Sequence, residues 1–492
     1  MKSIATLNLP QIFPHRIFVI FDLHLGGEHP PSHQTALRGF RICTQTALLA
    51  TFIRRVTQEG GTLRPCELVI NGDFVDFLAE KSDDNLQWQP FITEGERAAK
   101  QLSLMIERDR IVFDALKDLL AAGHRLTILL GNHDAELSLL PVRQVLEREL
   151  ETDGKRFRFI FDGEAYVVGS IIIEHGNRYD GWNVVDYDGL RRTRSAQSRG
   201  EDLAQERAFL PPAGSIMVAT VMNQIKEQFP FVDLLKPENE ATLPLLLTLA
   251  PQYREHLMKV MKLAIRAQRH SLNSNGQPRY AGDITARGWE STEVQLAHLL
   301  TAHVSDPEVS EFMELINRAA PPTLGGTEDE IASKGVVDYM SLFPIITTAT
   351  STPLASRLPA LLTALFTLRD ERSFDRSQED EQYLEPARKL INRGFKVVVF
   401  GHTHLAKKVE IGESIYLNSG AWADLIRFPY DQLGQEREHA LEWLSGFANH
   451  MERGEIKPYL LHMPTYARIE LDSGGTVLHA DIHDFAEGQP IV

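Results

Sequence analysis

The chain reads Ile17-Phe18-Val19-Ile20-Phe21-Asp22-Leu23-His24 near its N-terminus. Five consecutive apolar residues that end at a carboxylate are typical of a short, buried β-strand. Similar, mainly apolar runs lie at 67–71 and 126–130, each directly before a glycine. Helical periodicity is found between these runs at about 35–59 and about 95–122, and a further helix is expected at about 137–151. Strands that alternate with helices favour parallel pairing, so the sequence predicts an α/β fold.

The strand pattern divides the rest of the chain. Strands are expected at 157–161 and 165–174, and the pattern resumes at 396–400, 406–411, 414–418, 466–472 and 476–482. Between about 185 and 390 there are few β-rich runs and several helical stretches. We therefore expect a core in two pieces, 1–184 and 393–492, interrupted by a large, mainly helical insertion at 185–392.

Composition and charge exclude several classes of protein. Of the 492 residues, 43% are hydrophobic and 24% are charged, as in an ordinary globular protein. The formal net charge of −16 counts against non-specific binding to nucleic acids. No apolar stretch approaches the roughly 18–20 residues that span a bilayer, and the N-terminus lacks the pattern of a secretory signal. Only Cys43 and Cys66 are present, which suits a reducing compartment, so a cytoplasmic location is expected.

Polar side chains follow the expected strands in five short motifs. In chain order the motifs are Asp22-Leu23-His24, Gly72-Asp73-Phe74-Val75-Asp76, Gly131-Asn132-His133-Asp134, His175 and Gly401-His402-Thr403-His404. Each motif alone has an ordinary explanation, because turns favour Asp, Asn and Gly and a lone histidine is usually structural. Five such motifs in order after strands are hard to obtain by chance. Ligands gather at the carboxyl ends of parallel strands, so we expect one site there.

The residue types in these motifs suit two metal ions that leave open positions for a phosphate. Asp73 is the candidate bridge, because a carboxylate has two oxygens. Asp22 and His24 are two residues apart in extended chain and can reach one ion, and Asn132 can give an amide oxygen to the other, which leaves His133 to face the substrate. His175, His402 and His404 complete the set. Mixed imidazole and carboxylate ligands suit Mn, Fe, Zn or Co better than Ca, and manganese is the ion expected first.

The series of motifs resembles the signature of the calcineurin-like metallophosphoesterases, which is Asp-x-His, Gly-Asp-x-x-Asp, Gly-Asn-His-Asp/Glu, His and Gly-His-x-His. Every element is present, and the resemblance covers roughly 15–185 and 393–485. It implies a four-layer αββα sandwich that carries two divalent metal ions at one sheet edge. By this resemblance the ligands of the first ion are Asp22, His24, Asp73 and His404, and those of the second are Asp73, Asn132, His175 and His402. His133 would contact the phosphate and assist the leaving oxygen, and Asp134 would orient His133.

A finer resemblance concerns the sequence around His133 and His175. Residues 131–137, together with His175-Gly176-Asn177-Arg178-Tyr179-Asp180 and Asn183, look like the branch that contains the UDP-2,3-diacylglucosamine diphosphatases. Those enzymes are much shorter and have no counterpart of the insertion.

Several residues are candidate contacts for the substrate. Arg178 and Asn183 follow His175 closely, and Arg191 and Arg192 belong to a basic cluster that comes soon afterwards. In the insertion, Lys259, Lys262, Arg266 and Arg269 recur at helical spacing and form either a basic face for a polyanion or an ordinary solvated face.

These features lead to one hypothesis on function and two alternatives. The first is a metal-dependent phosphoesterase that hydrolyses a phosphodiester or pyrophosphate, in which a metal-bridged hydroxide attacks phosphorus. Its substrate would be a nucleotide-like phosphate ester selected by the insertion. One alternative is a nuclease of the same fold, whose basic helix binds DNA or RNA, and the other is a non-catalytic scaffold. No feature of the sequence specifies an oligomer.

Overall fold

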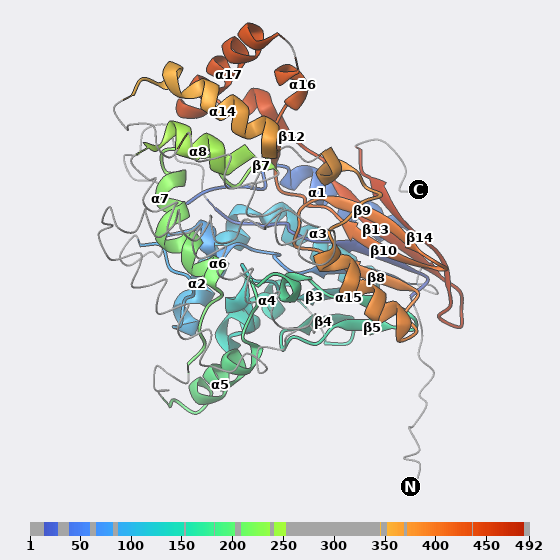
Figure 1. Cartoon of the computed structure of the whole chain (residues 1–492). Helices are drawn as coiled ribbons and strands as arrows, with labels where there is room; N and C mark the ends of the chain where they lie inside the picture. Colours follow the sequence, from blue (N-terminus) through green and yellow to red (C-terminus); the bar gives the residue numbers. More distant parts are fainter. Residues whose placement is uncertain are drawn as a thin grey trace, which may run out of the picture.

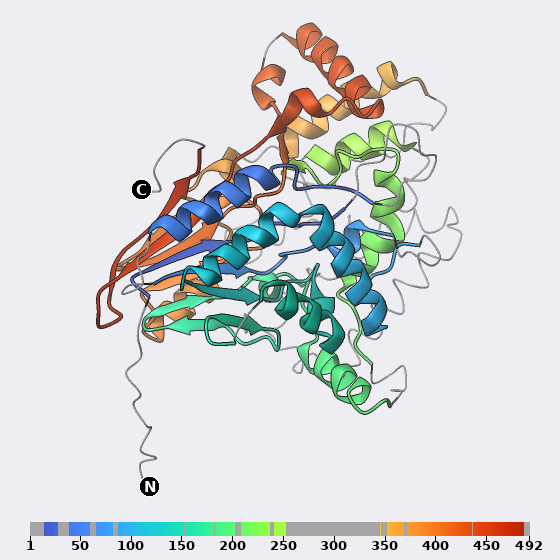
Figure 2. The same ribbon diagram turned by 180° about the vertical axis from the view of Figure 1, so that it is seen from behind.

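The computed structural model describes residues 14–27, 39–59, 65–81, 87–151, 154–181, 183–201, 208–236, 241–251, 345, 352–368, 371–434 and 436–486. The expected basic helix with Lys259, Lys262, Arg266 and Arg269 lies outside these residues. The described part is a mixed α/β structure with three sheets (Figures 1 and 2). None of its helices is long and apolar enough to cross a membrane.

The larger sheet has six strands in the order β14-β13-β1-β2-β3-β4. The strands are β1 (Arg16–Ile20), β2 (Cys66–Asn71), β3 (Arg125–Leu129), β4 (Phe157–Ile160), β13 (Thr465–Leu471) and β14 (Val477–Asp484). Strands β1 to β4 pair in parallel, with Val19 opposite Val69 and Ile70 opposite Ile128. The carboxyl ends of β1, β2 and β3 therefore lie at one edge of the sheet, as expected, and three of the polar motifs begin there.

The second sheet has five strands in the order β5-β6-β8-β10-β9. The strands are β5 (Tyr166–Val168), β6 (Ile171–Ile173), β8 (Val397–Phe400), β9 (Ala406–Ile411) and β10 (Ser414–Ser419). The single strand expected at 165–174 is an antiparallel pair, because the chain turns at Gly169, whose φ is 56°. Strands β6 and β8 are parallel, with Ile173 opposite Val399, so His175 and His402 follow neighbouring strand ends.

Alternate side chains of the strands enter different apolar clusters. Ile17 and Val19 pack in a cluster with Val399 and Leu417 of the second sheet, so the two sheets face each other. Phe18 and the other side chains on the same face of the six-stranded sheet pack instead against four helices. These are α1 (Thr46–Glu59), α2 (Gly95–Arg108), α3 (Arg110–Ala121) and α4 (Leu140–Glu149). The other face of the second sheet packs against α15 (Glu381–Asn392). Helix α15 falls within the expected insertion but covers this sheet.

The helix expected at 95–122 is divided into α2 and α3 at Asp109. There the backbone leaves helical geometry, with φ at −105° and ψ at 26°. The buried carboxylate of Asp109 accepts the N–H of Gly26 at 2.8 Å and pairs with Arg41. The break therefore places a carboxylate against the loop that carries His24. Helix α1 also begins later than expected, because the described residues 39–45 are not helical.

A separate apolar cluster joins residues from three regions that are far apart in sequence. It contains side chains from η5 (Val218–Met222) and α7 (Asn223–Lys226), which continue the helical segment α6 (Ala213–Met217), from α8 (Leu243–Leu249) and α14 (Leu354–Leu368), and from α17 (Arg437–Glu452). A three-stranded sheet, β12 (Leu460–Leu461), β11 (Leu425–Arg427) and β7 (Leu235–Lys236), joins two of these regions, and α16 (Tyr430–Leu433) lies beside α17. Residues 425–461, expected in the core, thus pack with parts of the expected insertion.

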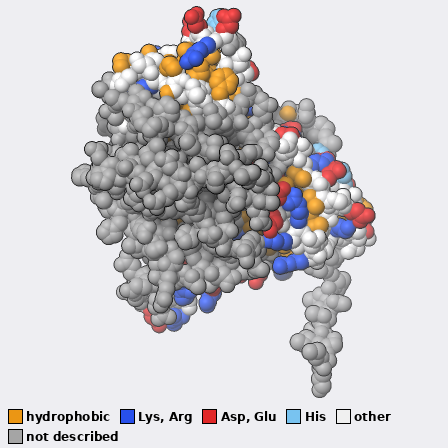
Figure 3. Space-filling view, viewed as in Figure 1, with side chains coloured by type: hydrophobic (Ala, Val, Ile, Leu, Met, Phe, Trp, Pro, Cys, Tyr) orange, Lys and Arg blue, Asp and Glu red, His pale blue; other side chains and the backbone are white. Residues whose placement is uncertain are grey.

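The described surface carries charges of both signs. On the face shown in Figure 3, Lys and Arg side chains are interspersed with Asp and Glu, and apolar side chains gather near α17. Helix α5 (Tyr187–Gln197), which carries Arg191 and Arg192, lies at the far end from α17 (Figure 1).

Candidate metal centre

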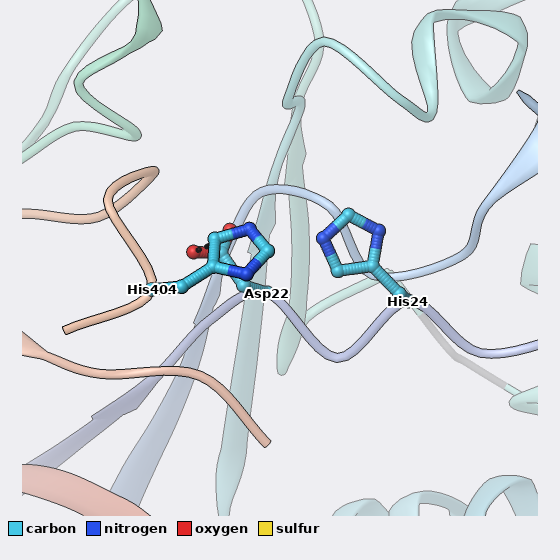
Figure 4. A group of neighbouring side chains, drawn as sticks. All are labelled: Asp22, His24 and His404. Atoms are coloured by element: carbon cyan, nitrogen blue, oxygen red, sulfur yellow. Dashed lines mark ion pairs between the residues drawn. The ribbon is translucent and has the colours of Figure 1, made fainter. Parts of the chain in front are cut away.

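The first group of side chains that could hold a metal ion is Asp22, His24 and His404. Their ligand atoms all lie within 4.8 Å of one another, and Nε2 of His404 lies 3.7 Å from Oδ2 of Asp22. Figure 4 shows that they come from two loops, with Asp22 and His24 on one and His404 on the other. The loop after β1 thus meets the loop after β8 at the expected edge of the sheets.

A second group is formed by Asp73, His175 and His402. Oδ2 of Asp73 lies 3.3 Å from Nε2 of His175 and 3.9 Å from Nε2 of His24. The Asp73 carboxylate therefore lies between the first group and the second. This is the position that a bridging ligand needs.

Asn132 lies at the second group. Its Oδ1 is 3.2 Å from Nε2 of His175, and its Nδ2 donates to Oδ1 of Asn183 at 3.4 Å. On the opposite side of the His175 ring, Nδ1 lies 2.8 Å from the carbonyl oxygen of Asn71. A carbonyl can only accept, so Nδ1 carries a proton, and in the neutral imidazole the lone pair of Nε2 faces the oxygens of Asn132 and Asp73.

A third group consists of His24, Asp76 and His133. Nδ1 of His24 lies 3.0 Å from Oδ2 of Asp76, and Nδ1 of His133 lies 3.2 Å from Oδ1. The same Oδ1 also accepts the backbone N–H groups of Leu78 and Ala79. One buried carboxylate therefore orients two imidazoles and leaves their Nε2 atoms turned to the site.

The backbone is strained at several of these residues. Within the described ranges, six residues other than glycine have a positive φ, and five of them are Asp22, His24, Asp73, His402 and His404. The sixth, Glu151, lies elsewhere. L-residues rarely adopt this conformation, and such strain concentrates at functional sites.

Two glycines make room for the ligands. A Cβ at Gly131 would lie 2.0 Å from Oδ1 of Asp73, and a Cβ at Gly72 would lie 2.5 Å from Nδ1 of His175. Gly72 also has a φ of 87°. Only glycine lets these backbone segments approach the ligands so closely.

Burial and mutual contact shift the ionisation of these groups. Burial raises the pKa of Asp22, and the nearby Asp73 raises it further. Burial would also raise the pKa of Asp73, but His175 and His133 outweigh it and hold this pKa well below its usual range. Burial lowers the pKa of His175, yet the Asp73 carboxylate raises it to about 9. For His404, burial and then Lys236 lower the pKa.

The donor set fits bound cations. Both oxygens of Asp22, Nε2 of His24 and Nδ1 of His404 are buried and make no hydrogen bond within the described part of the chain. Burying such groups unsatisfied is unfavourable. Oxygens of Asp73 and Asn132 also converge on Nε2 of His175, which has a lone pair in the neutral imidazole. Divalent ions bound by mixed oxygen and nitrogen ligands would satisfy both sets.

In the described chain Asp134 makes no hydrogen bond to the His133 ring, although it was expected to orient it. Its Oδ1 accepts the N–H of Gly131 at 2.7 Å, and its Oδ2 accepts the N–H of Phe74 at 2.8 Å. Asp134 therefore ties the Asp73 loop to the Asn132 loop, and Asp76 is the partner of the ring. Burial, followed by the charge of Asp73, raises the pKa of Asp134 to about 7.

The expected substrate contacts lie in different surroundings. Arg178 donates to the carbonyl of Gly163 at 2.8 Å and lies 3.3 Å from Glu174. Arg191 and Arg192 pair with Asp188 and Asp186 of their own segment. Asn183 bonds to Asn132 and Asp180 within the site. Of these four residues, Asn183 makes a hydrogen bond to a predicted ligand, Asn132.

Four further residues belong to the site or its surroundings. Asp76 is the second aspartate of a quoted motif, so the sequence contained a signal for it. Asp180 lies 2.9 Å from Nε2 of His402, and the sequence contained a signal for it in the quoted stretch that runs from His175 to Asp180. Lys226 and Lys236 are buried, and their charges act on His133 and His404. The insertion was expected to select the substrate, but no motif indicated that residues 213–236 are the part of it that reaches this site.

The chain was compared with known proteins. No protein-family model matches it, and neither does any curated protein. Among solved structures, it is similar to the crystal structure of a dimetal phosphatase from Danio rerio. The two chains are 10% identical, the match covers 93% of each, and the TM-score is 0.25. At this TM-score the similarity supports no conclusion on fold or function.

Proposed function

We propose that this chain is a dinuclear-metal-dependent phosphoesterase of the calcineurin-like metallophosphoesterase superfamily, acting on a phosphodiester or pyrophosphate bond. The observation that carries the proposal is the convergence of ligand atoms at Asp73. Its carboxylate lies between His24 and His175, and the carboxylate of Asp22, which makes no hydrogen bond within the described residues, belongs to the neighbouring group. Two adjacent sites for divalent ions are a known arrangement for attack on phosphorus.

The packing of the two sheets supports the proposed four-layer αββα sandwich. Apolar clusters lie between α1–α4 and the six-stranded sheet, between the two sheets, and between the five-stranded sheet and α15. The polar motifs follow strand ends of both sheets, which is where ligands gather in such folds. In this proposal, residues 185–392 are largely an insertion that selects the substrate.

The proposed ligands fall into two sets that share one residue. The first set is Asp22, His24, Asp73 and His404, and the second is Asp73, Asn132, His175 and His402. The two metal groups built around Asp22 and Asp73 support this division. Divalent ions, when bound, would activate a water molecule and neutralise charge on the phosphate. Manganese is the ion proposed first, with iron, zinc and cobalt as alternatives.

His133 is the proposed catalytic residue. Burial lowers its pKa, but the carboxylates of Asp76 and Asp73 outweigh this effect and raise it to about 10. With Nδ1 held by Asp76, Nε2 can donate a proton to the leaving oxygen. Asp134 would act by holding the Asn132 loop, on which His133 lies.

An anionic, nucleotide-like substrate is supported by two buried lysines of residues 213–236. Lys226 lies over the ring of Phe40, with Nζ 5.7 Å from the ring centroid, and pairs with Asp233. The helical segment that carries Lys226 is held beside the site by a hydrogen bond, because Nδ2 of Asn223 donates to the carbonyl oxygen of Leu78 at 2.8 Å. Lys236 lies on β7, which pairs with β11. The proposal of an anionic substrate does not depend on the contacts expected from the sequence, which were Arg178, Asn183, Arg191 and Arg192.

An assay of the manganese-loaded protein tests the proposal. The panel contains aryl phosphate mono- and diesters, nucleotides, UDP-2,3-diacylglucosamine, and labelled DNA and RNA. We expect hydrolysis of at least one diester or pyrophosphate, loss of activity in Asp73→Ala and His133→Ala, and full activity in His479→Ala, which changes an exposed histidine of β14. Activity confined to monoesters would refute the diester preference. Full activity of both site variants would refute the mechanism.

The same panel decides between the alternatives. A nuclease would cleave labelled DNA or RNA and bind it with a steep dependence on salt concentration. The formal net charge of −16 counts against this alternative. A non-catalytic scaffold would turn over no substrate and retain no ion on metal analysis. The UDP-2,3-diacylglucosamine branch requires turnover of that substrate in preference to the others.

A further inference from the structure

The loop between β6 and α5 places a carboxylate beside the proposed ligand His402. Oδ2 of Asp180 lies 2.9 Å from Nε2 of His402, and both side chains are largely buried. The carboxyl group of an ionised aspartate can only accept, so this contact requires a proton on Nε2. In a neutral imidazole, Nδ1 is then the nitrogen with a free lone pair.

Asn183 extends this contact to a second proposed ligand. Its Nδ2 donates to Oδ2 of Asp180 at 2.7 Å, and its Oδ1 accepts from Nδ2 of Asn132 at 3.4 Å. The bond to Asn132 fixes the orientation of that amide, so that its oxygen, and not its nitrogen, is directed at His175. Asp180 and Asn183 together therefore touch two of the four proposed ligands of the second ion.

The loop that carries Asp180 is fixed by contacts of its own. The N–H of Asp180 donates to the carbonyl of Asn177, and Nδ2 of Asn177 donates to the carbonyl of Asn183. Tyr179 packs on Phe400, with ring centroids 4.9 Å apart, and its hydroxyl donates to Glu174. Because Phe400 ends β8 directly before Gly401 and His402, the loop is attached to the same strand end as its target.

Two other imidazoles of the centre, those of His24 and His175, follow the same rule. His24 directs Nδ1 to Asp76, and His175 directs Nδ1 to the carbonyl of Asn71. In each ring, one nitrogen is held by an oxygen acceptor and the other is directed at the ligand cluster. Acceptors of this kind fix the tautomer and the orientation of metal-bound histidines.

We propose that Asp180 and Asn183 are positioning residues for the second metal ion. Asp180 holds the Nε2–H of His402, so that Nδ1 is the atom offered to the ion, and Asn183 keeps the oxygen of Asn132 directed at it. The inference rests on the proposed dinuclear centre. It assigns His402 the opposite ring nitrogen from His24 and His175.

Metal titration of the full chain tests the proposal. Chelator-treated protein is titrated with Mn²⁺ in a calorimeter, comparing wild type, Asp180→Asn and Asp186→Asn. The control changes the same residue type nearby, where the carboxylate caps α5 through the N–H of Gly189 and touches no proposed ligand. We expect Asp180→Asn to weaken the second ion by about 10- to 100-fold and leave the first unchanged. The control should match wild type at both ions.

A spectroscopic measurement on wild type gives a result even if Asp180→Asn does not fold. In ¹¹³Cd-loaded protein with ¹⁵N-labelled histidine, the one-bond coupling to His402, assigned with His402→Gln, should be to Nδ1. Coupling to Nε2 would overturn the inference, as would wild-type affinity for both ions in Asp180→Asn. Either result leaves the proposed function intact if wild type still binds two ions. Failure of wild type to bind two ions would refute the dinuclear centre and this inference with it.

Discussion

Oδ1 of Asp76 lies 3.2 Å from Nδ1 of His133. The other oxygen of the same carboxylate lies 3.0 Å from Nδ1 of His24. Burial would raise the pKa of Asp76, but His133 and His24 outweigh it and lower this pKa, so the carboxylate remains ionised. Asp76 therefore couples a proposed metal ligand to the proposed catalytic histidine.

This relationship predicts that Asp76→Asn impairs catalysis although Asp76 touches no substrate. An amide can turn its NH₂ group toward Nδ1 of His133, which moves the ring proton to Nε2 and removes the charge that keeps the ring protonated. We expect kcat/KM for an ester with a poor leaving group to fall by about 10²- to 10⁴-fold, the usual contribution of general acid catalysis. The fall should be smaller for an aryl ester with a good leaving group.

The matched control for Asp76→Asn is Asp118→Asn, the same change at an exposed position of α3. The control should keep wild-type kinetics on both esters. Equal losses on the two esters in Asp76→Asn would contradict a role in protonating the leaving group.

Gly131 gives a steric test of the position of Asp73. Because a Cβ at Gly131 would lie 2.0 Å from Oδ1 of Asp73, Gly131→Ala must displace the carboxylate or the loop. We expect metal content by mass spectrometry to fall below that of wild type and activity to drop by at least about 10²-fold. The control is Gly446→Ala on α17, where a Cβ meets nothing within 4 Å. Its metal content and activity should equal those of wild type, and its free energy of unfolding should rise by about 0.5–1 kcal/mol. Two retained ions in Gly131→Ala would contradict the placement of Asp73.

Glu136 predicts a pH dependence of stability. Burial raises the pKa of this carboxyl from its usual 4.5 to about 8, while its Oε1 accepts the N–H of Ile92 at 2.8 Å. Because the folded-state pKa is the higher one, the protonated group stabilises the fold fully below about pH 4.5. This contribution is lost as the pH rises through about 8.

The variant Glu136→Gln should remove this dependence, because its amide keeps the acceptor for Ile92 and cannot ionise. Between about pH 5 and pH 8, the free energy of unfolding of wild type should fall relative to the variant by an amount on the order of a few kcal/mol. Urea denaturation at each pH measures the difference. Glu442→Gln, at an exposed position of α17, should follow wild type at every pH. A constant difference between wild type and Glu136→Gln would show that Glu136 does not titrate in this range.

The strands could be predicted because their signal is local. The expected runs at 67–71 and 126–130 correspond to β2 (Cys66–Asn71) and β3 (Arg125–Leu129), and the run at 406–411 has the bounds of β9. Buried parallel strands are continuous apolar runs, and this composition is visible without any tertiary contact. The break between α2 and α3 was missed because it depends on a contact of Asp109 with Gly26, distant in sequence.

The site could be predicted only where its residues belong to strand-end motifs. The residues quoted from the five motifs meet at one edge because the register of β1, β2 and β3 aligns their ends. The charge of Lys226 acts on His133 because of how residues 213–236 pack, which periodicity does not encode. Asp134 was expected to hold the His133 ring, but Asp76 does so. Both aspartates stand in quoted motifs, and the direction of their side chains, which the motifs do not specify, determines which one contacts the ring.

Removal of metal should reverse the effect of one substitution on stability. Asp22 is fully buried, its two oxygens make no hydrogen bond within the described residues, and Asp73 repels its charge. In chelator-treated protein, Asp22→Asn therefore removes an unfavourable buried charge, and we expect its Tm to exceed that of wild type. In the presence of metal the order should reverse, because the carboxylate is a proposed ligand. At an ion concentration of 100 times Kd, binding stabilises wild type by about 2.7 kcal/mol.

Thermal unfolding of both proteins, with chelator and with Mn²⁺, measures this reversal. A bound ion acts only on the folded state, so wild type should gain more from Mn²⁺ than Asp22→Asn does. Asp118→Asn should gain as much as wild type, because its change lies outside the centre. If Asp22→Asn shifted Tm in the same direction in both conditions, the Asp22 carboxylate would not be a ligand. A group other than a metal ion would then have to offset the unfavourable free energy of burying the Asp22 charge.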